Sequence, residues 1–219
     1  MKGLLAGLVE RWRPNADGAP RGRRGLWKMR GSRNGWLFLS LLLMALPGCG
    51  GAASNAEKTG EVTQVTESTR ISDVINDPLF GDCGRLLFPV DSGYWGGDTL
   101  GSLSLAWYSH VRPARTVGIV NALRERASAG NRIFYRIYSD EEMRADPRKA
   151  DTGLFFFRGR PGARFAVCSA GGGFVYVGAM HDSFPHAQEL SKKGYNAFAL
   201  IYRPDAGTAC EDLARAIVF

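Results

Sequence analysis

A chain of 219 residues with 45% hydrophobic and 11% aromatic side chains has enough apolar material for one globular domain with a sizeable core. The formal net charge of +7 arises within residues 1–33, which hold nine Lys or Arg and two acidic residues, so residues 34–219 are neutral. Phosphate binding depends on clustered positive charge, and this neutral body has no basic run. The composition therefore argues against a nucleic-acid partner.

The N-terminal segment is typical of an export signal. The apolar stretch 36–46 is too short to span a bilayer, which takes about 20 residues, and small residues follow it. The sequence "LPGC", which ends at Cys49, resembles the lipobox of bacterial lipoproteins, although Pro47 is an unusual occupant. An ordinary signal peptide with an incidental cysteine is the alternative. We expect residues 1–48 to be the signal peptide, which becomes 29–48 if translation starts at Met29.

Residues 49–69 predict a lipidated Cys49 followed by a small, polar, flexible linker. Such a chain is expected to be an exported lipoprotein anchored to the membrane, at the cell surface or the periplasmic face. Export also places Cys83, Cys168 and Cys210 in a compartment that permits disulfides. One disulfide with a free thiol and three isolated thiols both fit, and the spacing matches no zinc site.

The first part of the body predicts one clear helix. Residues 71–110 are punctuated by Gly, Pro and Asp and indicate irregular structure without a long element. Residues 114–129 have apolar side chains at helical spacing and are followed by Gly130. The alternating residues 132–138 predict a strand, and residues 139–151 a solvated turn or a short helix.

The second part of the body predicts a parallel α/β arrangement. The expected elements are strands at 153–158, 164–169 and 196–202 and helices at 182–193 and 208–219. The strand at 164–169 is nearly all apolar, as expected of a strand covered on both faces. Gly194 closes the first of these helices, and Thr208 is the expected N-cap of the second. Strand, glycine loop, helix and strand form a right-handed crossover, so the fold class is α/β.

The stretch "SAGGGFVY", residues 169–176, places three glycines between a strand and a helix. A dinucleotide fingerprint needs a glycine where Tyr176 stands, and a phosphate loop needs a lysine that is missing. The chemistry that remains is an oxyanion hole, in which the backbone N–H groups of Gly171, Gly172 and Gly173 face a developing alkoxide. A glycine turn that only permits close packing is the alternative.

Residues 153–217 resemble the esterase and lipase branch of the α/β-hydrolase superfamily, especially small secreted acetyl-esterase-like carbohydrate esterases. The segment "GLFFFRGRPGARFAVCSAGGGF" resembles the second strand, third strand and oxyanion loop of that family. "HAQELSKKGYNAFALIYRP" resembles its first helix and fourth strand, and "ACEDLARAI" the helix before the nucleophile. The resemblance implies a truncated α/β-hydrolase fold over residues 70–219, with the first four strands of the sheet.

The resemblance also implies a class of substrate and the position of one strand at the edge of the sheet. Relatives of this branch cleave short acyl esters or acetyl groups on sugars and use neither metal nor cofactor. In the family's strand order the fifth strand lies beside the third, so the strand at 164–169 is expected to be an open edge, which is a pairing hazard.

Two departures from the family concern catalysis. Ala170 stands where many relatives have a histidine that supports the glycine loop. The family nucleophile lies in a G-x-S-x-G turn after a fifth strand, with Asp and His later, and residues 1–219 contain none of these three. Ser169 begins half of such a turn, but Val167 stands where a small residue is needed. We therefore expect no complete triad in this chain.

The other polar candidates predict little chemistry. His181 and Asp182 are adjacent and diverge around a helix, so they are not expected to pair. A helix cap and surface positions are the favoured interpretation of His181 and Asp182, and the border of a pocket beside the loop is the alternative. His110 has no identifiable partner, and Arg203 is expected to form a structural ion pair. The sequence thus favours the N-terminal part of an exported, lipid-anchored serine esterase that is inactive as this chain. A non-catalytic lipoprotein that binds ligands on a degenerate hydrolase scaffold is the alternative.

Overall fold

The computed structural model describes residues 63–108 and 110–219, and the predictions for the signal peptide and Cys49 lie outside these residues. A four-stranded sheet of order β3-β4-β6-β5 forms the centre of the fold. Its strands are β3 (Phe134–Tyr135), β4 (Gly153–Phe157), β5 (Phe165–Ser169) and β6 (Asn196–Ile201). β5 and β6 are parallel, whereas β4 is antiparallel to both of its neighbours. The α/β class is confirmed, with a mixed rather than a wholly parallel sheet.

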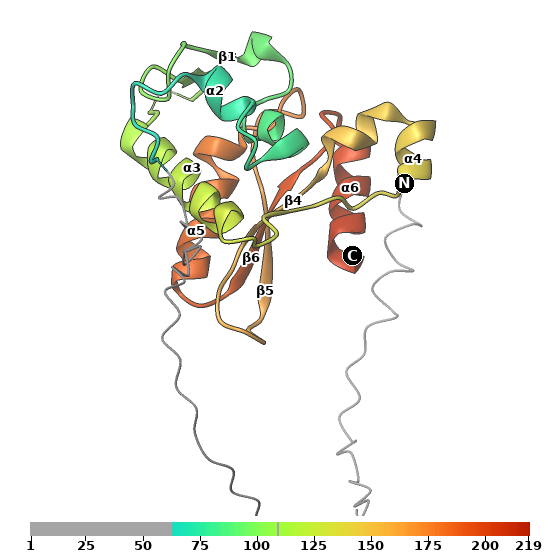
Figure 1. Cartoon of the computed structure of the whole chain (residues 1–219). Coiled ribbons are helices and arrows are strands. Elements are labelled where there is room, and N and C mark those ends of the chain that lie inside the picture. The colour runs from blue at the N-terminus through green and yellow to red at the C-terminus, as the bar shows by residue number, and fades with distance from the viewer. Residues whose placement is uncertain (1–62, 109) are drawn as a thin grey trace, which may run out of the picture. The chain divides into compact units, whose positions relative to one another are not determined.

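Helices lie on both sides of this sheet (Figure 1). α3 (Pro113–Ser128) and α5 (Ser183–Lys192) lie together on one side, and α6 (Ala206–Val218) lies on the other. Each of the three helices agrees with its predicted range to within two residues. α5 joins β5 to β6, which forms the expected parallel crossover. None of the described helices is long and apolar enough to cross a membrane.

The segment before α3 consists of short elements, as its punctuated sequence predicts. They are α2 (Ile71–Ile75), the 3₁₀ turns η1 (Gly81–Leu87) and η2 (Ser92–Tyr94), and the antiparallel pair β1 (Trp95–Gly96) and β2 (Ser104–Leu105). Between β3 and β4 lie α4 (Asp140–Ala145) and η3 (Pro147–Asp151). α4 starts with a capping box of Ser139 and Glu142, in which each side chain accepts the other residue's backbone N–H.

Two predicted strands differ from the structure. The strand expected at 132–138 is only two residues long, Phe134–Tyr135, and beyond it the Ile137 carbonyl accepts a hydrogen bond from Arg215 of α6. β5, which was expected to be covered on both faces, is an edge strand, and its Phe165 is 60% exposed. The edge position agrees with the open edge that the hydrolase resemblance implies.

The N-cap of α6 also differs from the prediction. Asp205, not Thr208, caps the helix, because its carboxylate accepts the backbone N–H groups of Gly207 and Thr208 at 2.9 and 3.1 Å. The Thr208 hydroxyl instead donates to the carbonyl oxygen of Arg203 at 3.2 Å. An aspartate can accept two of the free N–H groups at a helix start, so it is the stronger cap here.

A buried ionic network fixes the end of β6. Arg203 is 3% exposed and donates from its backbone N–H and its guanidinium to Asp212 of α6, which is fully buried. The Tyr138 hydroxyl donates to the same carboxylate at 2.6 Å. Arg203 also pairs with Asp146 at 2.9 Å and with Glu211 at 2.8 Å. The expected structural ion pair is confirmed, and it joins β6, α6 and the segment before β4.

We predict that Asp212→Ala destabilises the fold by about 3–5 kcal/mol, because it leaves the Arg203 guanidinium buried without its main partner. Urea denaturation followed by circular dichroism measures the free energy of unfolding. Glu211→Ala is the matched control, because Glu211 pairs with the same guanidinium but its side chain is 58% exposed. The control is expected to cost about 1 kcal/mol or less. Equal losses for the two variants would contradict the central role of Asp212.

Candidate functional site

The glycine loop, defined here as residues 170–178, follows β5 at the carboxyl end of the parallel strand pair. Ligands of α/β sheets commonly bind at this end of the strands. Gly172 and Gly173 have φ values of +142° and +60°, in the left-handed region. A Cβ on Gly172 would lie 2.0 Å from the Tyr176 carbonyl oxygen. Conformation and space therefore both require glycine at position 172.

Asp182 fixes the start of this loop. Its Oδ2 accepts the backbone N–H of Gly171 at 2.7 Å and the Tyr108 hydroxyl at 3.2 Å. Its Oδ1 lies 3.2 Å from Nδ1 of His186, one turn along α5. Asp182 is the residue before α5 but makes no side-chain cap to that helix. Its carboxylate instead contacts the backbone of the loop and the side chains of Tyr108 and His186.

Two of the three successive glycines of the loop have unpaired backbone donors. The Gly172 carbonyl accepts the N–H groups of Val175 and Tyr176, and the Gly171 carbonyl accepts that of Gly178. The N–H groups of Gly172 and Gly173 donate to no atom in the part of the chain that the structure describes. Of the three predicted oxyanion donors, Gly171 is thus occupied by Asp182, and the next two have no acceptor, with Gly172 buried and Gly173 exposed.

Aromatic side chains that sequence reasoning missed surround these donors. Trp107 and Phe174 have φ values of 66° and 61°, which are uncommon for bulky residues, and they are 71% and 50% exposed. The Trp107 ring lies against Gly173, and the buried Tyr176 ring stacks on Tyr94 with 4.9 Å between centroids. Strained conformations of this kind cluster at functional sites. No local sequence pattern predicts positive φ at a tryptophan or a phenylalanine.

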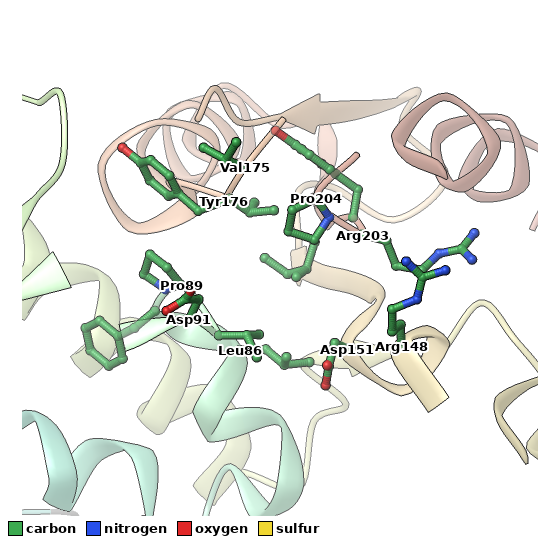
Figure 2. A pocket seen from close by; sticks show the side chains of 14 residues that line it. Leu86, Pro89, Asp91, Arg148, Asp151, Val175, Tyr176, Arg203 and Pro204 are labelled. Carbon is green, nitrogen blue, oxygen red and sulfur yellow. The ribbon is translucent and has the colours of Figure 1, made fainter. Parts of the chain in front are cut away.

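A cavity of about 270 Å³ adjoins the loop (Figure 2). Val175, Tyr176 and Val177 of the glycine loop form one wall, and the residues that follow β6 form another. The segment of η1 and η2 contributes apolar side chains, among them Leu86 and Pro89. Sequence reasoning missed this cavity, because residues 86–91 meet the loop only through the tertiary fold.

The structure separates the three histidines into two places. His110 and His181 lie together, with Arg112 and Arg115, around a hollow of about 310 Å³. His186 is exposed and contacts Asp182, a pair that its i, i+4 spacing on a helix could have indicated. In residues 63–108 and 110–219, no hydrogen bond joins a serine, threonine or cysteine side chain to a histidine ring.

The nucleophilic side chains of the described residues lack the environment of an activated nucleophile. Ser169 is exposed at the end of β5. Cys83, Cys168 and Cys210 are three unpaired thiols, which agrees with the second of the two alternatives from the sequence. Burial raises the pKa of Cys83 to about 12 and also raises the pKa of Cys168, so both thiols stay protonated near neutral pH.

Neither a group of metal ligands in the described residues nor a similar known protein indicates what the site does. The residues that the structure describes contain no group of three or more His, Cys, Asp or Glu side chains placed to hold a metal ion. Comparison of the chain with known protein families, curated proteins and solved structures found no match.

We predict that Asp182→Asn lowers the pKa of Tyr108. Burial is the first cause that raises this pKa to about 12, and the charge of Asp182 and its hydrogen bond are the next causes. The variant removes the charge but not the burial, so the pKa is expected to fall and to remain above 10. Tyrosine ring resonances followed by NMR against pH measure it. Asp140→Asn, at an exposed position on α4, is the control and is expected to change nothing.

We also predict a pH dependence of stability that depends on His181. Burial lowers the pKa of this ring from 6.5 to about 4 in the folded chain, so the unfolded chain binds its proton at higher pH. Above about pH 6.5 the ring is neutral in both states and costs no stability. As the pH falls from 6.5 towards 4, the unfolded chain takes up the proton first, so the free energy of unfolding decreases. Because the ring is partly exposed, the expected loss is about 2 kcal/mol.

The measurement is the free energy of unfolding at pH 7 and pH 4 for the wild type and for His181→Gln. The variant is expected to lose less stability than the wild type over this interval. His186→Gln is the control, because His186 is 72% exposed. The same loss in the wild type and in His181→Gln would show that His181 is not the group concerned.

Proposed function

We propose that this chain supplies the oxyanion loop of an exported, lipid-anchored carboxylic ester hydrolase and does not turn over esters by itself. The observation that carries the proposal is the pair of unpaired N–H groups at Gly172 and Gly173, on a loop that Asp182 fixes. Such donors stabilise the oxyanion of a tetrahedral intermediate, and removing one typically costs about 10²–10³ in rate. Fixed donors need no reorganisation when charge develops.

The strand order supports an α/β-hydrolase scaffold over residues 70–219. The resemblance equates β4, β5 and β6 with the second, third and fourth strands of that family. In that family the fifth strand lies beside the third, so the resemblance also requires β5 to lie at an edge of this sheet. β5 lies at an edge of the sheet, next to β6, and α5 connects the two. The anchor at Cys49 and the signal at 1–48 belong to the same proposal and rest on the sequence alone.

The absence of turnover follows from the polar contacts of the loop. A serine hydrolase needs a nucleophile in hydrogen-bonding reach of a base, with a third group that orients the base. His186 and Asp182 have the relation of a base and the group that orients it. However, no hydroxyl in the described residues donates to His186. The substrate class that the resemblance implies is a short acyl ester or an acetylated carbohydrate.

A non-catalytic binding module is the second candidate. The observation that favours it is the exposed pair Trp107 and Phe174, held in strained backbone beside the loop. Exposed aromatic rings can bind the apolar faces of a ligand without chemistry. In that case Gly172 and Gly173 would donate to a ligand carbonyl rather than to a reacting one.

We predict that the purified 219-residue chain does not hydrolyse p-nitrophenyl acetate above the rate of Ser169→Ala and of buffer. The physical reason is that oxyanion donors without a nucleophile have no tetrahedral intermediate to stabilise. Release of p-nitrophenolate measures the rate. Turnover that Ser169→Ala abolishes would overturn the proposal of an inactive chain.

The donor role is tested separately by titrating the chain with acetate, whose carboxylate resembles the oxyanion. Amide NMR spectra are expected to show saturable shifts at Gly172 and Gly173. Asp182→Ala is expected to weaken these shifts, because the loop loses its anchor at Gly171. Asp140→Ala is the matched control and should retain them. An acetate titration that leaves both glycine amides in place would refute the donor role.

A further inference from the structure

A second hollow of the molecule is lined by arginine and histidine side chains alone. Its volume is about 310 Å³, and its lining residues are His110, Arg112, Arg115 and His181. The two arginines belong to the start of α3, whereas His181 ends the 3₁₀ turn η4 (Ala179–His181), so the tertiary fold brings them together. The hollow shares no lining residue with the cavity beside the glycine loop. It is therefore a separate surface, and none of its four residues is acidic.

The two arginines have no partner of opposite charge. Arg112 and Arg115 are exposed, and neither side chain forms an ion pair or a hydrogen bond within the part of the chain that the structure describes. Lys192 is the main cause that lowers the pKa of Glu189 on α5, and Arg115 contributes less to it. Glu189 nevertheless hydrogen-bonds Lys192, at 2.7 Å, rather than Arg115. The donors of both guanidinium groups are therefore open to a ligand.

The position of these arginines is electrostatically unfavourable without an anion. Arg112 is the N-cap of α3 and Arg115 lies in its first turn, where the helix dipole has its positive end. Acidic side chains are favoured at this place, but the first turn of α3 has none and its N-cap makes no side-chain hydrogen bond. Two like charges also repel each other at this spacing. An anion between the two guanidinium groups would relieve both effects.

His181 makes the wall of the hollow polar without adding charge. Burial lowers the pKa of its ring to about 4, so the ring is neutral at pH 7. Its Nε2 atom is buried and has no hydrogen-bond partner in the described residues, although buried polar atoms are nearly always paired. The charge of the hollow that depends on no histidine is thus that of Arg112 and Arg115.

Charge and size together indicate the class of ligand. A phosphate monoester carries about −1.5 to −2 charges at pH 7, which matches two arginines, whereas a carboxylate or an organic sulfate carries a single negative charge. Arginine also binds phosphate oxygens through paired N–H···O bonds. The volume of 310 Å³ lies at the lower end of the range of small-molecule sites, about 300–1,000 Å³. It therefore exceeds the need of an inorganic ion and has room for a small organic part.

We propose that this hollow binds a small phosphate monoester, and that Arg112 and Arg115 are the residues that hold its phosphate group. His110 and His181 lie beside the bound phosphate. The site is independent of the proposed esterase role, because none of its four lining residues belongs to the glycine loop. It gives the chain a ligand of a different chemical class from an ester carbonyl.

The test titrates the 219-residue chain with sodium glycerol phosphate and with sodium acetate, at pH 7 and matched ionic strength. Imidazole resonances followed by NMR report where each anion binds. Glycerol phosphate is expected to shift the resonances of His110 and His181 saturably and to bind at least tenfold more tightly than acetate at this place. His186, which is 72% exposed and does not line the hollow, is the internal control and is expected to stay unshifted.

Three variants localise the binding. Arg112→Gln and Arg115→Gln each remove one charged fork from an exposed position, so the fold should tolerate them. Each is expected to weaken binding of glycerol phosphate at least fivefold, because one set of charge-assisted hydrogen bonds is lost. Arg144→Gln is the matched control, since Arg144 is an exposed arginine of α4 that does not line the hollow. It removes the same charge and is expected to bind as the wild type does.

The outcomes separate this proposal from the proposed function. Equal affinity for the two anions, or the same loss in all three variants, would overturn it, because general charge attraction would then be sufficient. A titration that leaves His110 and His181 unshifted would overturn it as well. The donors at Gly172 and Gly173 are tested by their own amide signals with acetate, so either proposal can fail while the other stands.

Discussion

The hydrogen bond from the Gly171 N–H to Asp182 is the constraint on which the candidate site depends. At 2.7 Å it joins the end of β5 to the residue that precedes α5, across the whole glycine loop. A bond from a backbone N–H to a carboxylate is stronger than a neutral one. It takes the first of three glycine donors out of use and leaves Gly172, which is buried, and Gly173, which is exposed, without a hydrogen-bond acceptor in the described part of the chain.

The same carboxylate couples the loop to the rest of the fold. The Tyr108 hydroxyl donates to Asp182, so the segment before α3 is tied to the loop. Tyr176, at the far end of the loop, donates from its hydroxyl to the carbonyl of Ala106. The Tyr202 hydroxyl donates to the Ala170 carbonyl at 2.7 Å, which ties the loop to the end of β6. The loop is therefore held at both ends by buried tyrosines.

The sequence predicts the helices and strands of this fold better than their hydrogen-bond partners and their order in the sheet. Helical spacing and the closing Gly194 define α5, because these signals are local. The short β3 could not be foreseen, because strand pairing is a tertiary property, and the edge position of β5 was expected only from the resemblance and not from its apolar sequence. The role of Asp205 rather than Thr208 as a cap depends on a choice between two good capping residues, which spacing alone does not resolve.

The candidate site is likewise predictable where it depends on local sequence and not where it depends on tertiary contacts. Three adjacent glycines after a strand indicate close backbone approach, but not which N–H group is occupied. That depends on Asp182, eleven residues away from Gly171. The strained Trp107 and the cavity between residues 86–91 and the loop come from parts of the chain distant in sequence. Sequence therefore identifies the loop, and only the fold identifies its donors and its apolar neighbour.

The most direct test of this account is amide hydrogen exchange at the three successive glycines. Exchange reports whether each N–H is hydrogen-bonded in the folded chain. The account predicts slow exchange at Gly171, which Asp182 protects, and faster exchange at Gly172 and Gly173, whose N–H groups have no acceptor in the described part of the chain. Slow exchange at Gly172 and Gly173 would contradict it, because those groups would then already be bonded within the protein.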